Sequence, residues 1–479
     1  MHERIARAIR ARRTTAAAIA LGLAGVLAAQ PAGASHVEPP GQDVQGSPSA
    51  SVSPGSRKPA WARTFDGPLH HDDYAVATAV SPDGTRLYVT GSVTDYPRHV
   101  YGTIAYDAHT GATLWVQTFA GPLKIDTVEE LVVSPDGARV FVSGTGKVPN
   151  HSYDIETVAY DAQTGAQLWV QTFNDGHGQT DGPGGMAVSP DGSLLFVTGG
   201  AGEIQSMTIA YDATTGAHRW LAVEEEGWFT SGLAVSPDGA RVFVIGTWHC
   251  CARENLAAYA YDAATGRRLW ARSVTRGPET KERSLGIAMS PDGSLVVGIA
   301  SIGSCCTEAW LVVAFEADSG HIRWLRTFGT PPLYSRPSSA IVSPDGSVVL
   351  VTGFGTLQDE TDTFTVAYDT ATGATLWVQR FGAPDENDQG CGIDVAPDSS
   401  RGYVTETSFT ATQGSDCAIL SYELATGDLR RVDRVNGPSN GDDTCDDIEV
   451  SPDGAWFYTT GKTESESTGS DFLTLAYRA

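Results

Sequence analysis

The sequence predicts an all-β protein, folded as a single eight-bladed β-propeller of four-stranded blades. Two recurring phrases predict it. The first is A-Y-D-x-x-T-G-x-x-x-W, which is nearly perfect in five copies, as in AYDAHTGATLW at residues 105–115 and AYDATTGAHRW at 210–220. The second is SPDG followed by an apolar run, as in SPDGTRLYVTG from Ser81. Self-similarity at a period of this size indicates a repeat array or a propeller.

The second phrase counts the blades. Successive copies are 47 to 55 residues apart, and they begin at Ser81, Ser134, Ser189, Ser236, Ser290, Ser343, Ala396 and Ser451. The first period divides into short strands at residues 76–80, 87–91, 102–106 and 113–119, all rich in Val, Thr, Tyr and Phe, which favour pleated sheets. Pro-Asp-Gly and Thr-Gly suit the tight turns between them. A four-stranded sheet repeated around an axis is a propeller blade.

The two ends of the chain predict how the ring closes. The last repeat has its third strand at residues 472–477 and stops before its fourth. The first repeat is preceded by an extra segment, WARTFDGP from Trp61, which matches the fourth-strand segment LWVQTFAGP. We therefore expect residues 61–65 to complete the last blade, so that the ring has no open edge.

The tryptophan that ends the first phrase predicts packing between blades. An indole buries a large apolar area, which suits the contact between neighbouring sheets. Seven tryptophans occupy equivalent outer-strand positions, and Arg431 stands at the eighth: Trp61, Trp115, Trp169, Trp220, Trp270, Trp324 and Trp377.

The N-terminus predicts an export signal and a secreted, extracellular protein. Five arginines between Arg4 and Arg13 precede an apolar run, and small residues at 32–34 offer a cleavage site. An uncleaved anchor is the alternative, and the Sec and twin-arginine routes both remain open. We expect residues 1–34 to be a signal peptide, 35–60 a Pro/Ser/Gly-rich linker, and 61–479 the propeller.

The net charge of the chain excludes some classes of binding partner. The full sequence has a formal net charge of −25, and without residues 1–34 it has 27 lysines and arginines against 56 aspartates and glutamates. Such a surface repels phosphate backbones and anionic headgroups, so nucleic acid is excluded and no membrane span is expected in the mature chain. We expect a monomer that meets an extracellular protein, a glycan or a small molecule.

The first phrase resembles the tryptophan-docking motif of the eight-bladed quinoproteins, the pyrroloquinoline-quinone (PQQ) alcohol dehydrogenases. The same motif occurs in cofactor-free relatives, including the propeller lipoprotein of outer-membrane assembly. The SPDG phrase is similar to the YVTN and SBBP-type propeller repeats of secreted bacterial proteins. The resemblance covers residues 61–479 and implies the fold, but function does not follow from fold alone.

Function is expected on the rim opposite the SPDG and DAxTG turns, where the loops differ in every blade. All seven cysteines lie on or beside that rim, and disulfides are expected there. Cys250-Cys251 and Cys305-Cys306 occupy equivalent loops, either as vicinal bridges or as a link between the loops. Cys417 would pair with Cys391 or with Cys445, leaving one thiol. Metal binding by these cysteines with His249 is the alternative.

The resemblance gives the cysteine pairs a second interpretation, because PQQ alcohol dehydrogenases carry a vicinal disulfide over the quinone. This chain departs from that family in duplicating the pair and in lacking the inserted segments. The residues that would hold Ca²⁺ and act as the base are not identifiable from the sequence.

Acidic and aromatic residues supply the other candidates. Acid-rich crossovers at residues 70–73, 385–388 and 442–447 would either solvate loops or offer oxygen ligands to Ca²⁺. The weak metal candidates are Asp385, Asp388, Asp442, Asp443 and Asp446. Trp228, Trp248 and Trp310 lie outside the docking series and would either stack on a flat ligand or fill the core.

We therefore expect a secreted, non-catalytic propeller that binds a ligand or protein partner through its variable loops, with no cofactor. The alternative is a PQQ- and Ca²⁺-dependent quinoprotein dehydrogenase. A third hypothesis is a propeller hydrolase or lyase, because such sites assemble from separate blades.

Overall fold

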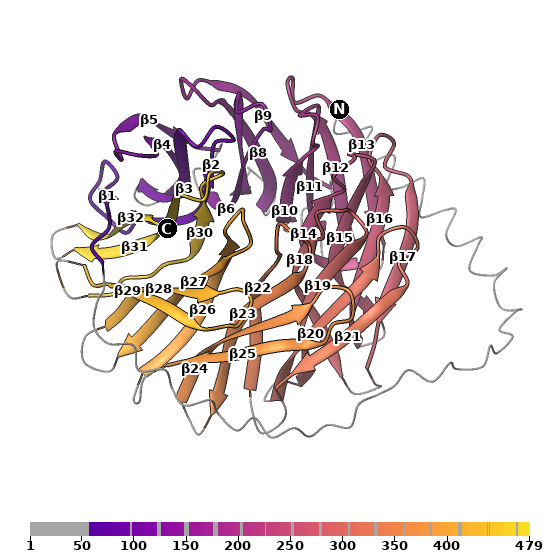
Figure 1. The fold of residues 1–479 in the computed structure, drawn as a ribbon. Coiled ribbons are helices and arrows are strands. Elements are labelled where there is room, and N and C mark those ends of the chain that lie inside the picture. The colour runs from indigo at the N-terminus through magenta and orange to yellow at the C-terminus, as the bar shows by residue number, and fades with distance from the viewer. Residues whose placement is uncertain are drawn as a thin grey trace, which may run out of the picture.

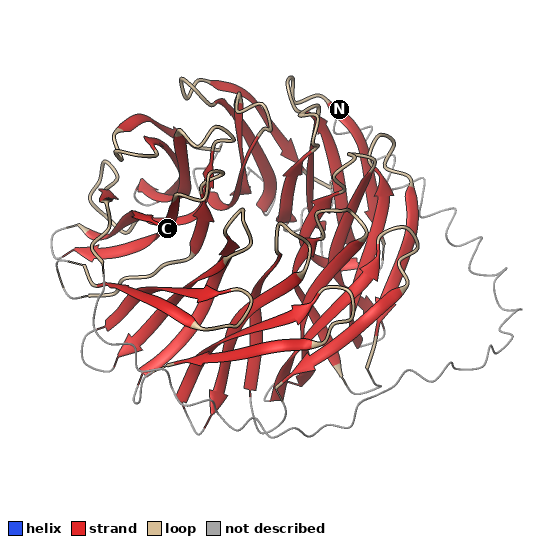
Figure 2. Cartoon of the chain, viewed as in Figure 1, coloured by secondary structure: helices blue, strands red, loops and turns tan. Residues whose placement is uncertain are grey.

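The computed structural model of the chain describes residues 57–95, 98–121, 126–147, 153–175, 181–201, 205–225, 227–250, 253–276, 280–304, 307–329, 334–357, 360–382, 386–410, 414–437, 439, 441–465 and 468–479. All regular structure in these ranges is strand, as Figure 2 shows. They contain no apolar helix of the length needed to cross a bilayer. The predicted signal peptide and most of the predicted linker lie outside the described residues.

Eight four-stranded antiparallel sheets form the blades. The inner strands are β2 (Tyr74–Val80), β6 (Asp126–Val133), β10 (Asp181–Val188), β14 (Gly227–Val235), β18 (Lys281–Met289), β22 (Tyr334–Val342), β26 (Glu386–Val395) and β30 (Asp447–Val450). The second strands are β3 (Arg86–Asp95), β7 (Arg139–Lys147), β11 (Leu194–Ala201), β15 (Arg241–Cys250), β19 (Leu295–Ser304), β23 (Val348–Leu357), β27 (Arg401–Thr410) and β31 (Trp456–Ser465).

The third strands are β4 (Arg98–Asp107), β8 (Tyr153–Asp161), β12 (Gln205–Asp212), β16 (Arg253–Asp262), β20 (Thr307–Glu316), β24 (Glu360–Asp369), β28 (Gly414–Glu423) and β32 (Gly469–Arg478). The outer strands are β5 (Thr113–Phe119), β9 (Gln167–Phe173), β13 (His218–Glu224), β17 (Arg268–Val274), β21 (Ile322–Phe328), β25 (Thr375–Phe381), β29 (Leu429–Val435) and β1 (Trp61–Phe65). Blades 1 to 8 are numbered by their inner strands. Figure 1 shows them following one another round a ring in chain order.

The predicted closure of the ring is confirmed. Strand β1 pairs antiparallel with β32, from Trp61 opposite Ala476 to Phe65 opposite Phe472. In Figure 1 the indigo first strand therefore lies beside the yellow last strands. Blade 8 is built from both ends of the chain, and no outer edge is left without its strand.

The second and third strands are longer than the sequence predicted. Residues 87–91 and 102–106 were expected to be strands joined by a loop of about ten residues, but β3 and β4 stay paired as far as Asp95 opposite Arg98. The equivalent segments of blades 4 and 6, residues 248–255 and 355–362, are likewise mostly paired strand. Polar residues continue these hairpins because backbone pairing does not depend on apolar side chains.

The described core is divided into eight clusters, each between two neighbouring blades. Each docking tryptophan lies in one of them and donates an indole N–H to a backbone carbonyl of the next blade. Trp61 Nε1 donates to Ala108 O at 2.9 Å, and the other six repeat this contact at 2.8 to 3.2 Å. The indole thus joins blade to blade by packing and by a hydrogen bond.

The glycine of the T-G turn makes this contact sterically feasible. Gly111 adopts φ +66°, and a Cβ added to it would lie 2.6 Å from Cδ2 of Trp61. The same turn geometry and the same approach of an indole recur at Gly165 and at the five later turns. Glycine is required because it alone accepts both the left-handed backbone and the close approach.

Arg431 replaces the eighth tryptophan at the one blade junction whose receiving turn is missing. Strand β1 supplies the outer strand of blade 8, so no T-G turn joins β32 to that strand and none is present for an indole to dock on. Arg431 instead donates to Arg478 O at 3.2 Å and lies over the rings of Phe457 and Tyr477. Seven tryptophans therefore match seven turns.

We predict that Trp169→Ala lowers the free energy of unfolding by about 3–5 kcal/mol, since it removes a buried ring and leaves a cavity. Trp169→Phe should cost less, because part of the packing stays and only the hydrogen bond is lost. The matched control is Leu168→Ala, which truncates the neighbouring side chain that is 47% exposed. Denaturant unfolding followed by tryptophan fluorescence would measure all three, and equal losses for Trp169→Ala and Leu168→Ala would contradict blade docking.

Candidate functional site

The structure describes only some of the rim residues that the sequence predicted as ligand-binding or metal-binding candidates. Cys251, Cys305, Cys306 and Asp385 lie outside the described residues, as do the side chains of Trp228, His249 and Cys250. The vicinal bridges therefore stay predictions. Trp310 fills the core rather than the rim, since it is fully buried and packs on Phe328 with 4.8 Å between ring centroids.

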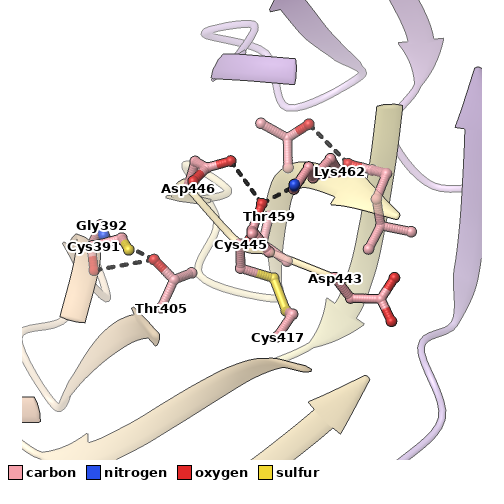
Figure 3. The surroundings of a disulfide bond; sticks show 12 residues. Cys391, Gly392, Thr405, Cys417, Asp443, Cys445, Asp446, Thr459 and Lys462 are labelled. Carbon is pink, nitrogen blue, oxygen red and sulfur yellow. Dashed lines mark hydrogen bonds between the residues drawn. A yellow bond between two sulfur atoms is a disulfide. The ribbon is translucent and has the colours of Figure 1, made fainter. Parts of the chain in front are cut away.

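Two of the described cysteines form a disulfide between blades. Cys417 in β28 is bonded to Cys445, which lies just before β30, with 5.1 Å between the Cα atoms. Cys391 is the remaining thiol of the predicted trio, and Figure 3 shows it beside Gly392 and Thr405, away from the bridge. Burial raises the pKa of the Cys391 thiol to about 12, so this group is a poor nucleophile at neutral pH.

Trp248 lines a shallow cavity on the side of the ring, not on the axis. The cavity has a volume of about 380 Å³ and lies between the outer parts of blades 3 and 4. Its other lining residues include Glu224, Tyr259 and Arg268, and Arg268 forms an ion pair with Glu224. Since this ion pair neutralises the carboxylate, the cavity offers a half-buried indole and little free charge.

The carboxylates of the acid-rich crossovers mainly accept hydrogen bonds from backbone N–H groups. Asp443 is buried and accepts the N–H of Gly437, six residues earlier. Asp73 does the same for Gly67, and Asp181 for Asp175 at 3.0 Å. Exposed Asp442 accepts from Ser415 N at 2.9 Å, and Asp446 from Thr444. The predicted candidates Asp388, Asp442, Asp443 and Asp446 are therefore not assembled into one ligand set among the described residues.

The ring axis holds a cluster of carboxylates that the sequence analysis missed. Asp394 of β26, Asp447 and Glu449 of β30, and Glu130 of β6 lie two or four residues before the first residue of the SPDG turn or its variant. Each accepts a backbone N–H from the inner strand of the next blade. The signal in the sequence was an acid inside an otherwise apolar inner strand.

These hydrogen bonds follow from the geometry of a propeller. The inner edge of each sheet faces the axis, so its N–H groups have no neighbouring strand. Asp447 Oδ2 accepts Thr78 N at 2.8 Å, and Asp394 Oδ2 accepts Val450 N at 2.6 Å. Acids four residues before the turn reach one N–H of the next blade, and acids two residues before it reach another. The carboxylates therefore cap exposed strand edges.

Burial and mutual repulsion keep these carboxyl groups partly protonated near neutral pH. Burial, and then nearby carboxylates, raise the pKa of Glu130 to about 8 and that of Asp447 to about 7. The same causes raise the pKa of Glu449 well above its ordinary value, and burial raises that of Asp394 to about 6. Groups that titrate near pH 7 suit proton transfer and are typical of functional sites.

The four axial carboxylates lie on one side of the ring of inner strands. Blade 1, between Asp447 and Glu130, carries only Ala77 and Ala79 at the corresponding positions. Blades 3 to 5 carry glycine and alanine there, and a Cβ on Gly185 would lie 2.8 Å from Gly232 Cα, so those inner strands approach closely. Acidic side chains at these inner-strand positions therefore occur only in blades 2, 7 and 8.

The donor set suits a hard cation, because carboxylate oxygens are the ligands that Ca²⁺ prefers. The axial oxygens are not drawn into a compact group, however. Within the described ranges, the one set of three groups whose ligand atoms lie within 4.8 Å of one another is elsewhere, at Asp66, Asp73 and Asp471. A cation on the axis would therefore draw these carboxylates inward or be reached through water.

Comparison with known proteins points to the quinoproteins. A family model described as outer membrane protein assembly factor BamB matches residues 154–305, less than half of the chain. A quinoprotein ethanol dehydrogenase of Pseudomonas putida is 28% identical over 175 residues, which cover 35% of this chain and 26% of that protein. A lanthanide-dependent methanol dehydrogenase of Methylacidiphilum fumariolicum (strain SolV) is 28% identical over 142 residues, covering 30% and 22%. The matched segments thus span about a quarter of each relative.

Solved structures extend the likeness of fold to most of the chain. A europium-containing methanol dehydrogenase has a TM-score of 0.53 at 12% identity, covering 88% of this chain and 93% of that chain. The Dos1 propeller has a TM-score of 0.58 at 14% identity, covering 87% and 95%. At such identities the likeness shows the fold alone. The docking repeats and the eight four-stranded sheets thus show an eight-bladed propeller that is similar to those of the PQQ-type quinoproteins.

We predict that the protein is more stable at pH 5 than at pH 8 in metal-free buffer. A carboxyl group whose pKa is raised by folding contributes stability below its unfolded value near 4, and loses it as pH rises through the folded value. For Asp394, Asp447 and Glu130 these folded values are about 6, 7 and 8. Thermal melts should show a midpoint several degrees lower at pH 8.

Glu130→Gln should reduce that difference, because the amide does not ionise. The control is Asp83→Asn in the first SPDG turn, where hydrogen bonds from Ser81 and Thr85 lower the pKa of the carboxyl group. Asp83 contributes stability above its folded pKa and loses it only as pH falls below about 4, so Asp83→Asn should leave the difference between pH 5 and pH 8 unchanged. A melting point that rises steadily from pH 5 to pH 8 would contradict the account.

Proposed function

We propose that this protein is a quinoprotein-type dehydrogenase whose axial channel binds PQQ together with a hard cation and oxidises a small alcohol. The observation that carries the proposal is the carboxylate cluster of Glu130, Asp394, Asp447 and Glu449, on the axis of an eight-bladed ring with docking repeats. The similarity to an ethanol and to a methanol dehydrogenase supports the same chemistry. It favours this alternative over the non-catalytic scaffold expected from the sequence.

The roles of the side chains follow from their positions. Asp447 of blade 8 and Glu130 of blade 2 flank blade 1, where only alanines stand at the corresponding positions, and would hold the cation from two blades. Glu449, whose pKa is raised by burial and by Asp394 and Asp447, would take the proton of the alcohol hydroxyl. When bound, PQQ supplies the acceptor for the two electrons that leave the alcohol carbon.

The non-catalytic scaffold remains the second candidate, and one observation favours it. Each axial carboxylate already accepts an N–H of the next inner strand, so the acids have a structural role without any ligand. The family model that matches residues 154–305 is described as an assembly factor, not as an enzyme. In this role the rim loops would bind a partner and the axis would only stiffen the ring.

The test is a titration of the metal-stripped protein with PQQ, alone and with Ca²⁺ or europium, followed by dye-linked oxidation of ethanol. We expect binding that requires the cation, and turnover that rises with pH because burial and nearby carboxylates raise the pKa of the Glu449 carboxyl group, which must lose its proton to act as the base. Asp447→Asn should weaken cation-dependent binding, and Glu449→Gln should lower kcat by about 100-fold or more, as loss of a general base does.

The matched control is Asp428→Asn, at a carboxylate beside the T-G turn of blade 7 whose side chain is 60% exposed. It should leave binding and turnover unchanged. Failure of the wild-type protein to bind PQQ with any of these cations would contradict the dehydrogenase and leave the scaffold as the function.

A further inference from the structure

Three carboxylates from the two ends of the propeller meet at the seam where the ring closes. Asp66 follows β1, Asp73 precedes β2, and Asp471 lies in β32, nearly four hundred residues later. One ligand atom of each lies within 4.8 Å of the other two. The pairing of β1 with β32 brings them together, since Phe65 stands opposite Phe472.

Two carboxylate oxygens of this group are buried without a hydrogen-bond partner. Asp471 is 7% exposed, and its Oδ2 accepts from Thr468 while its Oδ1 has no partner. Asp66 contacts His70 through Oδ2, and its Oδ1 is also buried and unpartnered. Buried charged oxygens without partners are costly, and their oxygens are free to bind a ligand.

Asp73 holds the centre of the group in place. It is fully buried, and its oxygens accept the N–H groups of Gly67 and, at 2.7 Å, of Thr94. Burial, and then the Asp66 and Asp471 carboxylates, raise its pKa to about 6. Each oxygen keeps a second lone pair after these bonds, so Asp73 remains a competent ligand.

In blade 6 a basic side chain neutralises the carboxylate at the corresponding position. Asp362 lies six residues before Tyr368, as Asp471 lies six before Tyr477, and Arg380 binds Asp362 at 2.6 Å. At the junction of blades 4 and 5, Lys281 and Arg283 bind buried Glu254. An arginine thus neutralises this carboxylate in blade 6, whereas Asp154 at the same place in blade 2 accepts from the amide of Asn174 at 2.6 Å.

The closure seam lacks this basic partner. Arg380 lies three residues after Trp377, and the residue three after Trp61 is Thr64. Among the described ion pairs, the seam carboxylates have only the one with His70, whose side chain is 67% exposed. Among these ion pairs, three carboxylates therefore share one exposed imidazole.

We propose that Asp66, Asp73 and Asp471 bind a calcium ion that clamps the N-terminal crossover to the last strand of the ring. Ca²⁺ binds oxygens at 2.3–2.6 Å, so two ligands on opposite sides of the ion are about 4.8 Å apart, the upper limit of spacing found here. The ion occupies the role of Arg380 at the seam. This site is separate from the axial carboxylates and does not depend on the proposed dehydrogenase activity.

The experiment uses the full chain, stripped of metal with EDTA and transferred to metal-free buffer. Calcium binding is followed by calorimetry, and thermal melts are recorded with and without 1 mM Ca²⁺, well above the Kd range of about 10⁻⁷–10⁻⁵ M of sensor-type calcium sites. We expect Ca²⁺ to raise the melting temperature by a few degrees, because it binds the closed ring and not the unfolded chain.

Two variants separate the clamp from other effects. Asp471→Asn should abolish the calcium shift. Thr64→Arg, at an exposed position, should supply the missing charge, so it should raise the melting temperature in EDTA and also remove the calcium shift. The second variant is expected to fold even if the first does not, which keeps the test decisive.

Asp362→Asn is the matched control, since it alters the equivalent carboxylate at the junction that already has an arginine. It should lower stability equally with and without calcium and leave the shift intact. Asp447→Asn on the axis should also leave the seam shift intact. The proposal is overturned if wild-type protein shows no calcium shift, or if the shift survives in both Asp471→Asn and Thr64→Arg.

Discussion

The indole of one blade lies on the glycine turn of the next, and the rest of the ring depends on that contact. A four-stranded sheet with two apolar faces is not stable alone and must be covered on both sides. The contact between Trp115 and Gly165, with the hydrogen bond to Ala162 O at 3.1 Å, fixes the spacing and the angle at which this covering occurs. Repeated round the ring, it leaves the inner strand edges facing one another across a narrow axis.

That arrangement explains why the functional candidates are acids at strand edges. The inner N–H groups need acceptors, and Asp394 and Asp447 supply them from the neighbouring blade. The same burial raises the pKa values of these carboxyl groups toward neutrality. The need for acceptors at the inner strand edges therefore places titratable oxygens where a cation and a substrate would meet. The proposed chemistry depends on carboxylates that the packing of the blades already requires.

The sequence predicted the architecture because the fold is local and repeated. The turns, the docking tryptophans and the closing strand at residues 61–65 all lie in short phrases whose physical meaning does not depend on distant residues. Arg431 was visible in the sequence as the one position at which the series of docking tryptophans is broken. Only the structure explains why an arginine stands there, because blade 8 has no T-G turn to receive an indole.

The sites were less predictable because they join residues from separate blades. Glu130 and Asp447 belong to different repeats, and only the ring brings them to one axis. Asp471 meets Asp66 through the pairing of the chain ends, which the closure model implied but no motif marked. Trp310, by contrast, was left open between core and ligand contact, and its complete burial places it in the core. The acid-rich crossovers drew attention by composition, yet Asp443 mainly holds the Gly437 N–H.

The most direct test of the account is anomalous diffraction from crystals grown with europium and PQQ. The account predicts one metal peak on the axis, between Asp447 and Glu130, with quinone density beside it, and a second peak at Asp66, Asp73 and Asp471. Crystals that diffract well and show no metal on the axis would contradict the central claim, that the axial carboxylates form the functional centre of this propeller.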